Sequence, residues 1–126
     1  MHKYLYIVTT LFIIFPNISF SNSTINDGNE FLHSLNYHHD IAYAKGKTDF
    51  SLIEGSNAFY AISIVDTTVY LSGFFKDKYK VCFPKNLTRN DTYKAVKDYL
   101  INNPDKLNRH PNSLALSAIR HSYRCS

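Results

Sequence analysis

The sequence of 126 residues has no tryptophan, a single methionine, and only four glycines and four prolines. So little glycine and proline excludes low-complexity and collagen-like chains. Charged residues make up 19% of the chain and hydrophobic residues 44%, a balance that allows a buried core and excludes a disordered polypeptide. The length excludes a TIM barrel and leaves room for one small domain.

A strong excess of one charge is also absent. The 14 basic and 10 acidic residues leave a net charge of +4, and the basic residues are spread through the sequence. This pattern predicts no stripe of cations along a nucleic-acid backbone, so we expect no nucleic-acid partner. A protein partner with an acidic face is modestly favoured.

No apolar run is long enough to cross a bilayer. The longest, over residues 4–15, has about 12 residues, whereas a spanning helix needs about 20. It follows Lys3 and precedes the small residue Ser21, a pattern typical of a signal peptide. We therefore predict a signal peptide over residues 1–21 and a mature domain over residues 22–126, without membrane attachment after cleavage. A retained membrane anchor is the alternative, and it too would place the domain outside the cytoplasm.

Cysteine is scarce, with only Cys82 and Cys125. In an exported chain, such a pair is more typical of a disulfide than of a metal site. A disulfide between them would close a loop of 43 residues and stabilise the fold by about 4 kcal/mol. A cysteine nucleophile with a histidine partner is the alternative, but neither cysteine lies in a recognisable catalytic motif.

Four segments carry helical patterns. The first runs from about residue 28 to 45 behind a capping motif, and the second covers residues 57–72, where a strand is the alternative because β-branched residues are frequent. The third begins after Thr88 and ends before Pro104, and the fourth begins at His110-Pro111. The sequence thus predicts an all-α fold, a compact four-helix domain with one disulfide, with five helices as the alternative count.

The connector between the second and third helices has no clear period and mixes aromatic residues with cations. These residue types are common anchors of protein interfaces, so we predict a partner-binding surface here. Its residues are Phe74, Phe75, Lys76, Lys78, Tyr79 and Lys80. An ordinary solvated loop with its phenylalanines tucked into the core is the alternative, and the polar turn at residues 102–112 is a second candidate surface.

No constellation in the sequence predicts chemistry. His38, His39 and Asp40 are adjacent, and adjacent helical residues point about 100° apart, so they do not form one chelating face. Asp66 lies in an apolar segment, either as a buried carboxylate with a raised pKa or as one satisfied by a neighbouring tyrosine or lysine. We predict no catalytic residue, no metal, no cofactor and no enzyme activity.

A set of short motifs in the C-terminal part of the chain forms a recognisable pattern: Val81-Cys82-Phe83-Pro84, Leu87-Thr88, Val96, Tyr99-Leu100, Asn103-Pro104, Arg109-His110, the segment 114–119 and Cys125. With these motifs the chain resembles the Rap/Tai family of type VI secretion immunity proteins. The resemblance covers about residues 27–125 and is most specific from residue 81 onward.

This resemblance implies an all-helical periplasmic protein without catalytic activity. It would bind a peptidoglycan-cleaving amidase effector, protect its producer from that toxin, and form a homodimer. An exported envelope adaptor on the same scaffold, with no toxin partner, is the alternative. A small secreted enzyme is the third possibility.

Overall fold

The computed structural model describes residues 25–43 and 51–126. The predicted signal peptide, residues 1–21, lies outside them. The elements in the described part are α2 (Gly28–Tyr43), α3 (Leu52–Ser72), the 3₁₀ helix η1 (Asp77–Tyr79), α4 (Arg89–Asn102), the 3₁₀ helix η2 (Pro104–Lys106) and α5 (Pro111–Ser122). These ranges contain four α-helices and no strand, which confirms the predicted all-α class.

Helix α2 begins at a cap formed by acidic side chains. Asp27 Oδ1 accepts hydrogen bonds from the backbone N–H groups of Asn29 (2.9 Å) and Glu30 (3.0 Å). The Glu30 carboxylate reaches back to accept from the Asn26 N–H at 2.6 Å. The predicted capping motif is therefore present, with the reach-back shifted by one residue. The predicted end near residue 45 lies outside the described residues.

Helix α3 confirms the helical alternative for residues 57–72, but it begins earlier than predicted, at Leu52. Ser51 caps it, because its Oγ accepts from the Glu54 N–H at 3.5 Å. This Ser-x-x-Glu spacing is itself a helix-start signal. The prediction missed it because it followed the apolar pattern, and the first apolar residues, Leu52 and Ile53, are exposed.

Helices α4 and α5 begin where the sequence predicts. Thr88 Oγ1 accepts from the Asp91 N–H at 3.2 Å, and the Asp91 carboxylate accepts from the Thr88 N–H at 2.9 Å, which completes a reciprocal capping box. At α5, His110 Nδ1 accepts from the Asn112 N–H at 3.3 Å, and Pro111 occupies the first turn. His110 is therefore the N-cap of α5.

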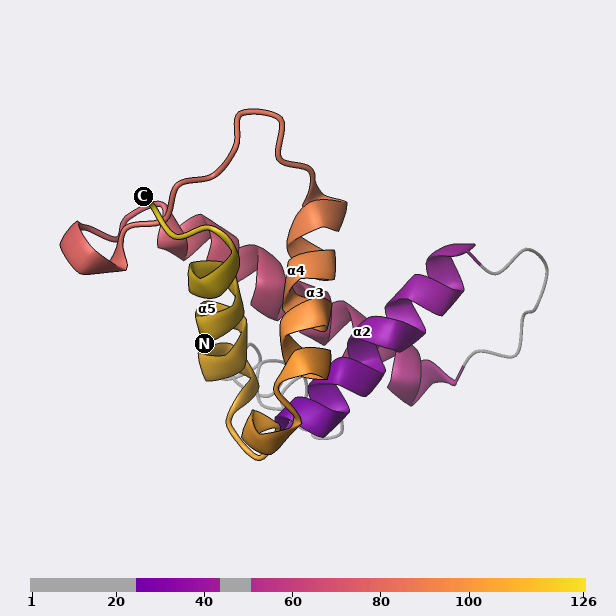
Figure 1. Cartoon of the computed structure of the whole chain (residues 1–126). Helices are drawn as coiled ribbons and strands as arrows, with labels where there is room; N and C mark the ends of the chain where they lie inside the picture. Colours follow the sequence, from indigo (N-terminus) through magenta and orange to yellow (C-terminus); the bar gives the residue numbers. More distant parts are fainter. Residues whose placement is uncertain (1–24, 44–50) are drawn as a thin grey trace, which may run out of the picture.

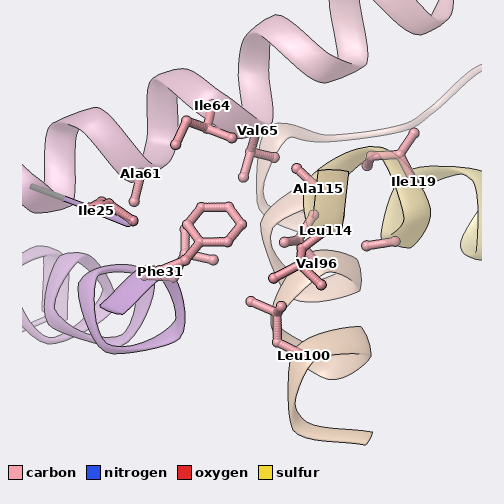
Figure 2. Close-up of a cluster of buried hydrophobic side chains, with 12 residues drawn as sticks. Ile25, Phe31, Ala61, Ile64, Val65, Val96, Leu100, Leu114, Ala115 and Ile119 are labelled. Carbon is pink, nitrogen blue, oxygen red and sulfur yellow. The ribbon is translucent and has the colours of Figure 1, made fainter. Parts of the chain in front are cut away.

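The core lies where α3, α4 and α5 meet α2. Figure 2 shows the ring of Phe31, from α2, between the α3 side chains and those of α4 and α5. Phe31 is fully buried. Its neighbours in this cluster are aliphatic: Ile25, Leu35, Ala61, Ile64, Val65, Val96, Leu100, Leu114, Ala115, Ala118 and Ile119. Apolar burial of this kind is the main driving force for packing the helices together.

The connector and the C-terminal tail are tied together at one end of the molecule. Cys82 and Cys125 form the predicted disulfide, with Cα atoms 5.0 Å apart. The Cys82 N–H donates to the Tyr123 carbonyl at 2.8 Å, and Val81 and Arg124 form an isolated antiparallel bridge. Figure 1 shows the tail running beside the connector. Within the described ranges, no helix has the length and apolar character of a membrane span.

Candidate protein-binding surface

The predicted surface on the connector is largely exposed. Phe74 is 65% exposed and Tyr79 47%, while Phe75 is half-buried. Lys76, Lys78 and Lys80 are exposed. The phenylalanines therefore do not both tuck into the core, as the alternative would have them do. Phe74 instead packs its ring edge against Tyr70 of α3, with centroids 5.4 Å apart.

The backbone of η1 presents the cations and Tyr79. Asp77 has a φ of 53°, in the left-handed region that aspartate tolerates better than most residues. The Tyr79 N–H donates to the Lys76 carbonyl at 3.1 Å and closes the turn. In Figure 1 this turn projects from the helices beside the C-terminal tail.

One partly exposed stripe of α5 extends the surface beyond the connector. Asn112, Leu116, Arg120 and Arg124 follow one another at intervals of four residues, so they share a helix face that continues into the tail. Three adjoining hollows lie along this stripe, and the character of their lining changes from apolar to cationic.

The first two hollows are mainly apolar. One, of about 380 Å³, lies between α3 and α5 and is lined by Tyr60, Leu71, Phe75 and Leu116, with Ser63, Ile64, Thr67, Thr68 and Asn112. The next, of about 520 Å³, shares Phe75 and Leu116 with it. Its other lining residues are Phe74, Lys76, Asp77, Tyr79 and Arg120. We call these two hollows the apolar groove.

The third hollow, about 490 Å³, begins where the apolar groove reaches Arg120. Five cations line it: Lys78, Lys80, Lys106, Arg120 and Arg124. Tyr99, Asn103, Ser117 and His121 complete the lining, and no carboxylate contributes to it. We call it the cationic hollow.

Aromatic rings contact three of these cations, and one of them is Lys78, whose Nζ lies 5.0 Å from the Tyr79 ring centroid. The Arg120 guanidinium lies 4.7 Å from the Tyr79 ring centroid, and Lys106 Nζ lies 5.3 Å from that of Tyr99. Lys106 Nζ also donates to Asn103 Oδ1 at 2.6 Å. Cation–π contacts keep the charge while limiting side-chain freedom, so the cations stay available to an anionic group.

The six residues of the predicted surface thus line these hollows together with residues that the sequence did not single out. Lys78 and Lys80 lie in the cationic hollow, and Phe74, Phe75, Lys76 and Tyr79 in the apolar groove. The cations are spread along the sequence, and the fold brings five of them together in this hollow. The four-residue spacing of Leu116, Arg120 and Arg124, read together with the disulfide, was the signal that could have found them.

Asp66 has a structural role. Its carboxylate accepts from the Arg89 guanidinium and from the Tyr93 hydroxyl, the latter at 3.1 Å. Burial, followed by the charge of Asp66, raises the pKa of Tyr93 to about 12. The cluster ties α3 to α4, and the tyrosine is one of the partners that the sequence suggested; the arginine was not foreseen.

The histidines do not form a metal site in the described part. No group of three metal-ligating side chains occurs among residues 25–43 and 51–126. His38 lies in a separate hollow of about 390 Å³ between α2 and α4 and meets the Tyr93 ring edge-on at 5.9 Å. Burial lowers the pKa of His38, so its neutral form is favoured.

The structure thus shows a small helical domain with one disulfide and a groove whose lining runs from aromatic to cationic, residue types that are common at protein interfaces. The model of the Rap1a immunity protein family matches residues 34–125, and the chain belongs to this family. No curated protein and no solved structure gave a significant match. Membership implies an inhibitor of a secreted effector rather than an enzyme.

Proposed function

We propose that the protein binds and inhibits a cognate peptidoglycan-cleaving amidase delivered by type VI secretion, and so protects its producer in the periplasm. The observation that carries this proposal is the match to immunity proteins over residues 34–125. Protection of this kind needs no reaction at the inhibitor, because occupying the cleft of a hydrolase is sufficient to block it.

Two features support action outside the cytoplasm. The sequence of residues 1–21 has the pattern of a signal peptide. The Cys82–Cys125 disulfide is of the kind that persists in oxidising compartments such as the bacterial periplasm. Peptidoglycan lies in the same compartment, so toxin and inhibitor would meet there.

The connector and the α5 stripe are the proposed contact surface for the effector. Phe74 and Tyr79 are exposed aromatic side chains at its centre, and such residues often carry most of the binding energy of an interface. Each, truncated to serine, is expected to cost about 1–2 kcal/mol of binding energy, a loss of roughly five- to thirtyfold in affinity.

The test is complex formation with a peptidoglycan hydrolase encoded beside the gene. Size-exclusion chromatography is expected to show co-elution of the two proteins, and Phe74→Ser with Tyr79→Ser is expected to weaken it. Ile101→Ser is the matched control, because Ile101 is 56% exposed on α4 and lines none of the three hollows. No complex with that hydrolase would contradict the proposal and favour an envelope adaptor.

We also propose that the protein forms a homodimer through the outer face of α3. This helix exposes large apolar side chains along its length, among them Ile53, Phe59 (71% exposed) and Tyr70. Water-exposed apolar area of this extent is better covered by a second copy than left open. Light scattering is expected to give twice the protomer mass for the wild type and for Ile101→Asp, but the protomer mass for Phe59→Asp. A monomeric wild type would contradict this interface.

A further inference from the structure

Among residues 25–43 and 51–126, the cationic hollow concentrates the positive charge. Five of the 11 basic residues in these ranges line it, so the six that remain are fewer than the nine acidic residues there. Its cations come from three segments distant in sequence: the connector, η2, and the end of α5 with the tail. Like charges that lie close together in one hollow repel one another, and a bound anionic ligand would relieve that repulsion.

No internal carboxylate neutralises these cations. In the described part of the chain, Arg89 pairs with Asp66 and Lys94 with Asp98, whereas none of the five cations in the hollow is within ion-pair distance of a carboxylate. Asp77 and Asp105 are sequence neighbours of Lys78 and Lys106, yet neither lines the hollow. The charge is therefore left for an external group.

The hollow is also pre-organised. Arg124 is held by its backbone bridge to Val81 and by the disulfide next to it, while Tyr79 orients Arg120. The Tyr123 ring packs on Phe83 at 5.2 Å and anchors the tail further. Groups fixed before binding lose less conformational freedom when a ligand arrives.

The adjoining apolar groove favours a protein ligand over a free anion. Arg120 lines both the apolar groove and the cationic hollow. One continuous partner segment can therefore place apolar side chains against Phe75 and Leu116 and acidic side chains among the cations. A free phosphate would leave the apolar groove unused. Guanidinium and ammonium groups pair well with Asp and Glu carboxylates.

We propose that the cationic hollow is a recognition site for the carboxylates of an acidic segment in a protein partner. The inference rests on the proposed function, in which that partner is the effector. It adds the chemistry of the effector's contact segment: carboxylates that lie next to an apolar anchor.

The test uses a fluorescein-labelled octaglutamate peptide, with octaglutamine as the uncharged control, and follows binding to the purified protein by fluorescence anisotropy. Octaglutamate is expected to bind and to weaken as salt rises, because exposed charge pairs are screened. The variant Lys78→Gln/Lys80→Gln/Arg124→Gln is expected to bind about tenfold more weakly, since each exposed pair contributes roughly two- to threefold. These three side chains are exposed, so the fold is expected to survive, which circular dichroism checks.

The matched control is Lys85→Gln/Lys94→Gln/Lys97→Gln, which removes the same net charge from residues that do not line the hollow. It is expected to change affinity by no more than about twofold. Equal losses in both variants, or no binding of octaglutamate by the wild type, would overturn the proposal. Inorganic triphosphate that binds where octaglutamate does not would also overturn it, in favour of a phosphate site.

The two proposals fail separately. If the hydrolase is inhibited equally well by the wild type and by the Lys78/Lys80/Arg124 variant, the acidic-segment inference is wrong and the immunity function stands. If octaglutamate binds as expected but the hydrolase is not inhibited, the hollow is an acidic-peptide site and the proposed immunity function is wrong.

Discussion

At the scale of single residues, Gly28 shows how closely the helices approach one another. A Cβ atom at this position would lie 2.5 Å from Leu114 Cδ1 and 2.9 Å from backbone atoms of Leu107. The Gly28 N–H also donates to the Leu107 carbonyl at 2.6 Å. The first turn of α2 therefore packs against the segment before α5 with no room for a side chain.

The substitution Gly28→Ala is expected to destabilise the protein by about 1–3 kcal/mol, because the backbone of Leu107 cannot move away cheaply. Gly55→Ala is the control within α3, where a Cβ would meet nothing within 4 Å. That change is expected to stabilise the protein by up to about 1 kcal/mol, since alanine is the better helix former. Urea unfolding followed by circular dichroism measures both, and a stabilising Gly28→Ala would contradict the described packing.

The disulfide is the second residue-scale feature, and its pairing could be predicted because only two cysteines are present. It links residues 43 apart in sequence. Replacing both cysteines with serine is expected to lower the free energy of unfolding by about 4 kcal/mol, by restoring entropy to the unfolded chain. Thermal and urea unfolding of the double variant against the oxidised wild type tests this value. A loss below 1 kcal/mol would show that the hydrogen bond and bridge around Cys82 hold the tail by themselves.

At the scale of elements, local capping signals predicted the starts of α4 and α5, whereas the start of α3 was missed because the prediction followed the apolar pattern and not the capping signal at Ser51. Thr88, Pro104 and Pro111 fix the ends of α4 and α5 through their own backbone and side-chain chemistry. Helix α3 is apolar on nearly all sides, and side chains such as Phe59 point to solvent while Ala61 is buried. Its periodicity therefore says little about which face is inside, and the pattern could not locate its first turn.

The capping box of α4 makes stability depend on pH. Hydrogen bonds from the Thr88 side chain and backbone lower the pKa of Asp91, so the folded state holds the ionised carboxylate more readily than the unfolded chain does. This contribution is fully present above the unfolded pKa of about 3.9 and is lost as pH falls through the lower folded value. The stability advantage of the wild type over Asp91→Asn is expected to shrink as pH falls through this range. Urea unfolding at a series of pH values measures it, and a constant difference between the two proteins would contradict this role.

At the scale of the whole molecule, the sequence indicated one part of the proposed contact surface, the connector, but not the other, the cationic hollow. The connector could be recognised because its aromatic residues and cations lie together in sequence. The cationic hollow could not, because Lys78 and Arg124 meet only after the chain has passed through α4 and α5 and the disulfide has closed. The net charge of the chain is modest, but the fold brings cations that are distant in sequence together in one site. Composition alone does not reveal this.

The central proposal is that this protein neutralises a secreted cell-wall hydrolase by binding it. The most direct measurement is a titration of a peptidoglycan hydrolase encoded beside the gene with the oxidised protein, while the release of peptidoglycan fragments is followed. The account predicts a linear fall in activity that reaches its floor at one protomer per hydrolase, as a tight inhibitor gives. Full hydrolase activity in the presence of excess protein would contradict the claim.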